Sequence, residues 1–443
     1  MGRHRVAFAA LVVLCSVVLA HSYVTSPASA AISEYDQQAT LDPTAREEVV
    51  PDRNGTTVVS GHGIDGDSAA LVAFGPDGSV RYYNDTYHGY FDVDPVEGTE
   101  STVEYVAERP YDNESCNAKC TLSVVERVNL TTGELTRVYR RIIPQDRGAN
   151  WHDVDRVGDH RLLVGDIHRD EMYVVDTKTG LTRWEWEVQH DFPISGGGEY
   201  PTDWAHLNDV EKLPDGRYMT SLRNQDQVVF VDPETGMQDD WTLGADDEYS
   251  VLYEQHNPDY IPKSEGGPAV LVADSLNHRV VEYQRTNGSW EQSWVWSDER
   301  MQWSRDADRL PNGNTLVADT NGNRVVEVNE SGDVVWSIDF YSPYEVERLG
   351  TGDESAGGPS AERANLTSQR VSGDSGDTET TVVAGVKPQK LLNGLSYMLP
   401  VWMGVTDAFV AAMLALTAIV WVIVELRALV PPISLRSPFE FER

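Results

Sequence analysis

The stretch DWAHLNDVEKLPDGRYMTSLRNQ, residues 203–225, contains the pattern that decides the fold. Two strand-forming runs flank a Pro-Asp-Gly turn, which predicts a pair of antiparallel strands. The first strand begins with Trp204, His206 and Asn208, and Arg223 follows the second. Side chains of this kind at a strand end are either surface decoration or the lining of a site. The rest of the chain helps to decide between the two.

A similar unit recurs six times in the middle of the chain. Each unit has a glycine turn between two strand-like runs. The turns are centred on Gly78, Gly133, Gly180, Gly236, Gly288 and Gly332. An acidic couplet, two acidic or amide residues separated by one other, precedes each of the last five turns. The couplets begin at Asp92, Asp153, Asp209, Asn257 and Asp306. Each unit therefore has the four strands of one propeller blade.

The first and last segments complete one another. Strands surround Gly78 without a couplet of the later form ahead of them, whereas YEVERLGTG from Tyr344 matches RDADRLPNG from Arg305 and has no strands after it. Joining the two gives one more blade, with the C-terminal strand innermost. The sequence predicts an all-β fold, a six-bladed β-propeller over residues 55–350 that closes by wrap-around pairing and leaves no open edge.

The innermost strands of a propeller line a central channel, so residues at their ends share one pocket. The residues directly before the couplets are Phe91, His152, Asn208, His256, Arg305 and Tyr344. His206 and His88 lie a few residues before two of them. The pattern predicts a functional cluster in the channel. The alternative is that these imidazoles only hydrogen-bond to backbone at strand ends, as buried polar groups must.

The net charge of the chain indicates the environment to which its surface is suited. It has 71 acidic residues against 35 basic ones, a net charge of −36. Because the carboxylates are spread along the chain, we expect a uniformly negative surface that repels nucleic acid and suits high salt.

Two apolar stretches frame the propeller. Residues 1–30 combine Arg3 and Arg5, an apolar run and Ala28-Ser29-Ala30, which predicts a signal peptide or an uncleaved N-terminal anchor. Residues 400–426 are long and apolar enough for a transmembrane helix. Residues 351–394 are expected to form a flexible acidic linker and residues 427–443 a cytoplasmic tail. An export signal places the propeller on the extracellular side of the cell membrane.

Cysteines and glycosylation sequons agree with that placement. Cys15 lies in the apolar leader, which leaves Cys116 and Cys120 as an expected disulfide. Asn-X-Ser/Thr sequons occur only between the two apolar stretches, which supports glycosylation outside the cell. They begin at Asn54, Asn84, Asn113, Asn129, Asn287, Asn329 and Asn365.

The segments YPTDWAHLNDVEKLPDG, SLRNQDQVVFVDPETG, LYEQHNPDYI and RLPNGNTLVAD resemble the arylsulfotransferases, with WAHLN and EQHN as the most specific parts. The resemblance extends over about residues 56–354. It implies an exported six-bladed propeller that moves a sulfuryl group from an aryl sulfate donor to a phenolic acceptor, without a nucleotide donor or other cofactor. A channel histidine would be transiently sulfurylated.

The motifs carry over His206 and His256 as catalytic positions and Arg223 and Arg279 as substrate-binding positions. From their place in the channel we add His152 to the catalytic set, and Arg305 and Asn208 to the binding set. Neutral imidazole is a good nucleophile near pH 7, and arginine supplies a planar fork of donors for sulfuryl oxygens. The chain departs from the family in having no histidine after His278, so that Arg305 fills the fifth channel position.

Two other functions fit parts of the sequence. VADSLNHRVVEY and VADTNGNRVVEV also resemble NHL-type repeats, which would make the protein a non-enzymatic propeller for adhesion or glycan binding at the cell surface. A cation-binding propeller that uses the acidic couplets is a weaker alternative. Because the couplets recur in every blade, they favour a packing role, and we expect no metal site.

Overall fold

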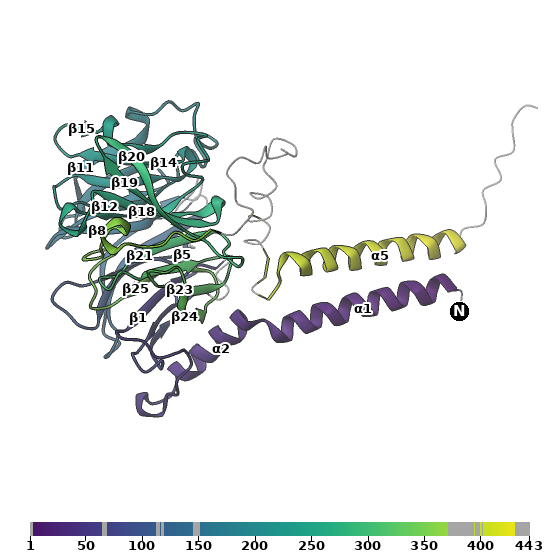
Figure 1. Ribbon diagram of the computed structural model, residues 1–443. Coiled ribbons are helices and arrows are strands. Elements are labelled where there is room, and N and C mark those ends of the chain that lie inside the picture. The colour runs from purple at the N-terminus through teal and green to yellow at the C-terminus, as the bar shows by residue number, and fades with distance from the viewer. Residues whose placement is uncertain are drawn as a thin grey trace, which may run out of the picture. The chain divides into compact units, whose positions relative to one another are not determined.

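The computed structural model describes residues 3–63, 69–111, 116, 119–144, 151–370, 394, 399–400 and 402–429. Its strands form six antiparallel sheets, which are the six blades of the predicted propeller (Figure 1). Neighbouring sheets contact one another through their innermost strands in the cyclic order β4, β8, β12, β17, β21 and β25. The all-β, six-bladed fold is thereby confirmed.

The blades follow one another along the chain. Blades 1 and 2 consist of β4 (Gly89–Pro95), β5 (Thr102–Tyr111), β6 (Cys120–Asn129) and β7 (Leu135–Pro144), then β8 (Trp151–Gly158), β9 (Arg161–Asp166), β10 (Glu171–Asp176) and β11 (Leu181–Glu187). Blade 3 consists of β12 (Leu207–Lys212), β13 (Tyr218–Leu222), β14 (Gln227–Asp232), β15 (Gly236–Met237) and β16 (Leu243–Gly244). Blades 4 and 5 consist of β17 (His256–Ile261), β18 (Ala269–Asp274), β19 (Arg279–Thr286) and β20 (Ser289–Trp296), then β21 (Ser304–Arg309), β22 (Thr315–Asp319), β23 (Arg324–Val328) and β24 (Val334–Asp339).

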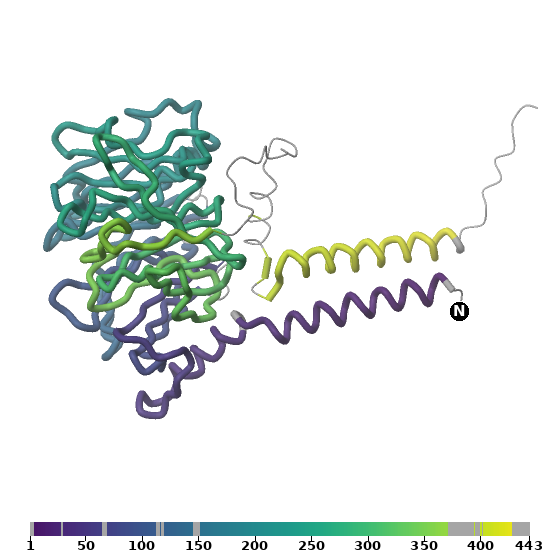
Figure 2. The backbone as a smooth tube through the Cα atoms, viewed as in Figure 1, coloured from purple at the N-terminus to yellow at the C-terminus, as the bar shows by residue number. Residues whose placement is uncertain are grey.

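Blade 6 joins the two ends of the propeller. Its order is β25 (Pro343–Arg348), β1 (Thr57–Gly61), β2 (Leu71–Phe74) and β3 (Val80–Asn84), with the C-terminal strand innermost. The register pairs Thr57 with Arg348 and Val59 with Val346. The predicted wrap-around closure is therefore present, and in Figure 2 the earliest and latest strands of the propeller lie together.

Local sequence explains the turns and the core. The six repeated glycines all have positive φ, between 69° and 89°, a conformation that glycine adopts without the steric cost of a Cβ atom. Six clusters of buried apolar side chains lie between adjacent blades, and each draws residues from both. The period of two in each strand supplies one face to the cluster before it and the other to the cluster after it.

Two helical segments add to the predicted propeller. Helix α2 (Pro27–Ala39) places Tyr35 against Phe74 and Phe340, and the Tyr35 hydroxyl donates to the carbonyl of Asp339. Residues 351–370, the first part of the predicted flexible linker, are ordered, and Ser355 and Ser360 are buried. They include the short helix α3 (Ala361–Ala364), whose Ala361 amide donates to Glu282. Polar side chains that satisfy buried backbone groups thus order a segment whose composition suggested disorder. The rest of the expected linker, residues 371–393, lies outside the described part.

Two apolar helices form a separate unit of the structure. Helices α1 (Arg3–Thr25) and α5 (Val405–Leu429) are long and apolar enough to cross a membrane. Short 3-10 turns complete the described part, at Pro43–Ala45, Val188–His190, Arg223–Gln225, Asp239–Trp241, Lys263–Glu265 and Ser275–Asn277. Cys116 and Cys120 are joined by a disulfide. Asn113 and residues 430–443 lie outside the described residues; Asn54, Asn287 and Asn365 are exposed.

Candidate active site

A β-bulge beside each acidic couplet positions the channel side chains. In four inner strands the extra residue of the bulge is the one directly before the couplet: His152, Asn208, Arg305 or Tyr344. The register also shifts beside the couplets of β4 and β17. A bulge redirects a side chain that would otherwise alternate between the sheet faces, and bulges are frequent next to active sites. The repeated bulge explains how residues far apart in sequence meet at one end of the channel.

Three of the predicted catalytic residues lie together in this cluster. The rings of His152 and His206 are 5.4 Å apart between centroids, and those of His256 and Tyr344 are 6.3 Å apart. The Tyr344 hydroxyl is 2.9 Å from Nδ1 of His152. The guanidinium of Arg305 lies 5.0 Å from the Tyr344 ring, which is within range of a cation–π contact.

Hydrogen bonds fix the tautomer of His256. Its Nδ1 is 2.8 Å from Ser275 Oγ and 3.2 Å from the Glu254 carbonyl oxygen. Ser275 donates its own hydroxyl hydrogen to the Ser304 carbonyl at 2.7 Å, so its oxygen must accept from His256. Both partners of Nδ1 are thus acceptors, and Nδ1 carries the proton. Nε2 is left with its lone pair, the state that a nucleophilic histidine requires.

His206 is held differently, because both of its ring nitrogens have partners. Nδ1 lies 2.5 Å from Oδ1 of Asp203, and Nε2 lies 3.0 Å from Nη1 of Arg223. Arginine only donates, so Nε2 accepts and Nδ1 donates to Asp203. Arg223 is in turn bound to Glu254 at 3.1 Å. An imidazole oriented by a carboxylate is the arrangement of a general base.

Burial and positive charge keep the imidazoles neutral. Burial, reinforced by Arg305 and Arg223, holds the pKa of His256 well below its ordinary value. Burial and Arg223 lower the pKa of His206, while Asp203 opposes them. Burial, with smaller effects from His206 and Arg305, also holds the pKa of His152 well below its ordinary value. The cluster therefore combines neutral nitrogen bases with two guanidinium groups, which suits an anionic substrate.

Two of the predicted binding residues are engaged elsewhere. Arg279 binds Asp274 at 2.6 Å and also donates to the carbonyls of Ser250 and Val251. It ties β19 to the preceding strand and loop, as Arg324 does through Asp319 in the next blade. Asn208 is fully buried and donates to the Gln255 carbonyl at 3.1 Å, which links blades 3 and 4. The structure brings Arg223 and Arg305 to the cluster, but these contacts hold Arg279 and Asn208 in the scaffold.

Four residues that belong to the cluster or hydrogen-bond to its histidines were not predicted from the sequence. The ring of His62 lies 5.1 Å from that of Phe91 between centroids, and burial and Arg305 lower its pKa to about 3. It follows β1, the second strand of blade 6, so a rule based on inner strands passes over it. Asp203, Glu254 and Ser275 were also missed, although the first two stand three and two residues before a predicted histidine. A search for hydrogen-bonding residues that flank the channel histidines would have found those two.

A cavity of about 300 Å³ lies beside the cluster. Asp203, Arg223 and Glu254 line it together with Tyr249 and Tyr253. The two tyrosine rings are 4.2 Å apart and offer flat apolar surface next to the His206–Arg223 pair. The cavity thus combines an aromatic wall with a cationic group at the edge of the cluster.

Comparison with known proteins points to one family. Residues 176–341 match the model of the arylsulfotransferase (ASST) family. No curated protein matches the chain. Solved structures similar to the chain include a protein of unknown function from Bacteroides caccae, with 13% identity, a TM-score of 0.45 and coverage of 67% of this chain and 99% of that one. Another is the periplasmic gluconolactonase of Pseudomonas aeruginosa, with 13% identity, a TM-score of 0.44 and coverage of 67% and 99%.

The matched segment runs from the end of blade 2 to the end of blade 5 and contains His206, Arg223, His256 and Arg305. It includes both motifs, WAHLN and EQHN, on which the resemblance was based. This part of the chain therefore matches the model of the same family that the motifs indicated, the arylsulfotransferases.

Proposed function

We propose that the protein transfers a sulfuryl group from an aryl sulfate to a phenolic acceptor, with His256 as the transient carrier. The observation that supports this most directly is the tautomer of His256, whose Nδ1–H is bound to Ser275 and Glu254 and whose Nε2 keeps its lone pair. His206 is less suited to attack, because both of its nitrogens are already hydrogen-bonded.

In the first step Nε2 of His256 attacks sulfur, the N–S bond forms and the S–O bond to the aryl group breaks. The electron pair of that bond leaves with the phenolate, which takes a proton from Nε2 of protonated His206, a form in which Arg223 no longer donates to that nitrogen and binds the sulfuryl oxygens instead. Burial and the field of Arg223 lower the pKa of His206, and the anionic donor offsets the field of Arg223 and so favours the protonated form. Arg223 and Arg305 bind the sulfuryl oxygens, where negative charge must be held throughout the transfer.

In the second step the acceptor phenol replaces the product. His206 takes the proton from the acceptor hydroxyl, the acceptor oxygen attacks sulfur, and the N–S electron pair returns to His256. Atoms and charge balance over the cycle, and no oxidant, nucleotide or cofactor is needed. The cavity wall formed by Tyr249 and Tyr253 would hold the aryl ring.

The experiment that tests this function uses the full chain in detergent at high salt. It is mixed with a chromogenic aryl sulfate in the absence of acceptor, and an acid-labile mass increase of one sulfuryl group is mapped to a peptide. The proposal requires the adduct on His256 and its loss when a phenol is added. Absence of both adduct and transfer would leave the non-enzymatic binding propeller as the better explanation.

We further propose that α1 is retained as an anchor that pairs with α5, with the propeller outside the cell. Arg5 binds Glu425 with its Nε at 2.7 Å, and Ser22 binds Asp407 at 2.6 Å. Phe8 also stacks on Trp421. A charged residue inside a bilayer costs about 2.5–3.5 kcal/mol unless it is paired. Pairing with Arg5 would offset this cost for Glu425, which lies in an apolar helix.

A further inference from the structure

A second set of buried side chains lines the channel and takes no part in the chemistry above. Each inner strand contributes the two positions of its acidic couplet. The first positions are Asp92, Asp153, Asp209, Asn257, Asp306 and Glu345, which we call the first ring. The second positions are Asp94, Asp155, Glu211, Asp259, Asp308 and Glu347. All twelve are buried or half-buried.

The first ring has a regular structural role. The amide that follows the first couplet residue in one blade donates to the first couplet residue of the preceding blade. Val154 donates to Asp92 at 3.1 Å and Val210 to Asp153 at 2.5 Å. Val346 donates likewise to Asp306 at 3.0 Å, and Val93 to Glu345 at 2.9 Å. These bonds tie neighbouring inner strands together and account for the recurrence of the couplets.

The ring is interrupted at Pro258. This residue occupies the position of the donating amide in blade 4, and proline has no N–H. Oδ2 of Asp209, which would have accepted that bond, is buried and has no hydrogen-bond partner among the described residues. Oδ1 of Asn257 is also buried and has no hydrogen-bond partner among the described residues, and Asn257 as a whole is only 7% exposed. The amide nitrogen of Asn257 donates to Oε2 of Glu345 at 3.4 Å, so the whole amide group lies against the ring.

Three arginines that directly follow couplets are paired with carboxylates outside the ring. Arg156 pairs with Glu104, Arg309 with Glu282, and Arg348 with Glu327. Buried carboxylates without a cation repel one another, and a buried oxygen without a donor costs free energy. One bound cation would reduce the repulsion between the carboxylates and would give the unpartnered oxygen a ligand contact.

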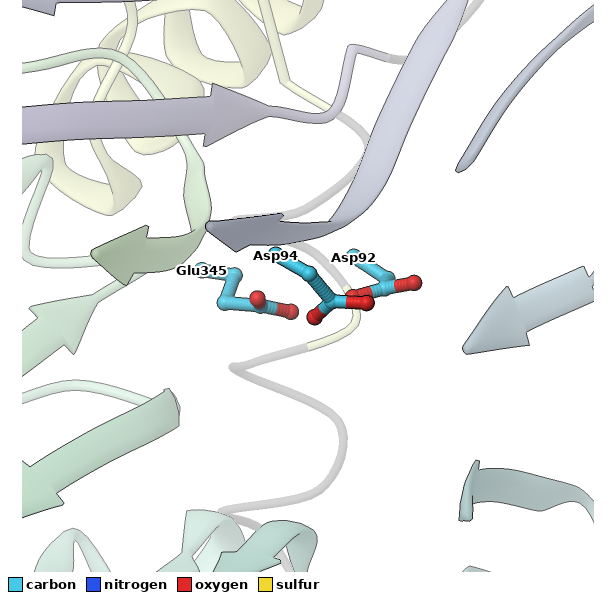
Figure 3. Close-up of side chains that lie close together, drawn as sticks. All are labelled: Asp92, Asp94 and Glu345. Carbon is cyan, nitrogen blue, oxygen red and sulfur yellow. The ribbon is translucent and has the colours of Figure 1, made fainter. Parts of the chain in front are cut away.

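The carboxylates are close enough to share an ion. One ligand oxygen from each of Asp92, Asp94 and Glu345 can be chosen so that all three lie within 4.8 Å of one another. Figure 3 shows these three carboxylate groups side by side, Asp92 and Asp94 from β4 and Glu345 from β25. Such an all-oxygen set favours a hard cation over zinc.

We propose that Asp92, Asp94 and Glu345, with Oδ1 of Asn257 as a neutral ligand, bind one Ca²⁺ ion in the channel. Calcium takes six to eight oxygen ligands in flexible geometry, whereas Mg²⁺ demands a strict octahedron and keeps several waters. The ion joins β4, β17 and β25, three inner strands from different blades. Its role is to hold the propeller together, so the inference is independent of the proposed transfer reaction.

The test is a binding measurement on the full chain in detergent, stripped with a chelator and kept at constant high KCl. Calcium content by atomic emission and thermal unfolding are followed as CaCl₂ is added. We expect one Ca²⁺ per chain and a saturable rise in Tm. Asn257→Leu should weaken binding at least about tenfold, the scale on which removal of a supporting group weakens metal sites. Asp246→Asn, in the separate group formed by Asp226, Asp246 and Asp247, is the matched control and should leave binding unchanged.

Three results would overturn the site: no calcium uptake by the stripped protein, an equal rise in Tm with MgCl₂ at the same ionic strength, or calcium binding that Asp246→Asn abolishes and Asn257→Leu does not. The wild-type titration needs no substitution, so it decides even if Asn257→Leu fails to fold. Sulfuryl transfer is not the readout, so either proposal can fail without the other.

Discussion

Nδ1 of His256 and Oγ of Ser275 are 2.8 Å apart, across the boundary between an inner strand and the turn after β18. Ser275 donates its hydroxyl hydrogen bond to the Ser304 carbonyl in blade 5, so a chain of hydrogen bonds runs from blade 5 to the imidazole in blade 4. The propeller scaffold thereby determines which ring nitrogen of His256 is protonated.

Removing this bond should slow transfer without weakening donor binding. In Ser275→Ala the Glu254 carbonyl, at 3.2 Å, is the remaining acceptor for Nδ1–H, so the ring is oriented less firmly. We expect kcat to fall about 10- to 100-fold with KM nearly unchanged, and Ser275→Thr to recover most of the loss. A rise in KM alone would instead mean that Ser275 shapes the binding pocket.

The two histidines should differ when each is replaced by asparagine. His256→Asn should abolish both adduct and transfer, because an amide cannot carry the sulfuryl group. His206→Asn should lower turnover by about 10²- to 10⁴-fold, the usual scale for a positioned proton-transfer group. His160→Asn, at an exposed turn between β8 and β9, is the control. Full activity in both His256→Asn and His206→Asn would refute the enzymatic proposal.

The buried His62 should make stability depend on pH below 6.5. Burial lowers its pKa to about 3, while the unfolded chain has the ordinary value near 6.5. Between these values the unfolded state binds more protons, so the free energy of unfolding decreases as the pH falls through this window. Relative to His62→Phe, the wild type should lose up to about 1.4 kcal/mol for each pH unit between 6 and 4.

Urea unfolding of both forms at several pH values measures this difference. His190→Phe, at a side chain that is 69% exposed, serves as the control. A constant difference between wild type and His62→Phe from pH 7 to 4 would show that His62 is not held neutral in the folded state.

Closure through β25 should be required for stability. Val346 is fully buried in this strand and pairs with Val59. Val346→Asp would bury a polar group without a partner, and we expect a loss of about 3 kcal/mol or more. Val334→Asp, at a position 42% exposed in β24, should cost far less. Equal melting temperatures for the two variants would argue against closure through this strand.

The N-terminal helix should remain on the mature protein. If α1 pairs with α5, a tag placed before residue 3 stays with the full-length chain after purification from membranes, and N-terminal sequencing begins upstream of Ala28. Glu425→Gln should weaken the association of the two helices, since it removes the charge that Arg5 binds. Recovery of a chain that begins near Ala31 would establish cleavage.

The sequence by itself determined the blade count and the closure. Both follow from local signals: a glycine that adopts positive φ in every unit, a period of two in the strands, and an incomplete first unit that matches an incomplete last one. It also pointed to His152, His256 and Arg305, because residues at the same place in every repeat must meet at the axis, and to His206 and Arg223 through the motifs that resemble the arylsulfotransferases.

Only the tertiary structure decided what each of these side chains does. Arg223 begins the turn after β13 and reaches His206, whereas Arg279 opens β19 and is held by Asp274. His62 enters the site from a second strand, and Asp209 keeps a buried oxygen without a partner among the described residues because Pro258, in the next blade, has no N–H to donate. Repeats predict positions, but hydrogen bonds between blades join residues tens to hundreds of positions apart, and no local pattern encodes them.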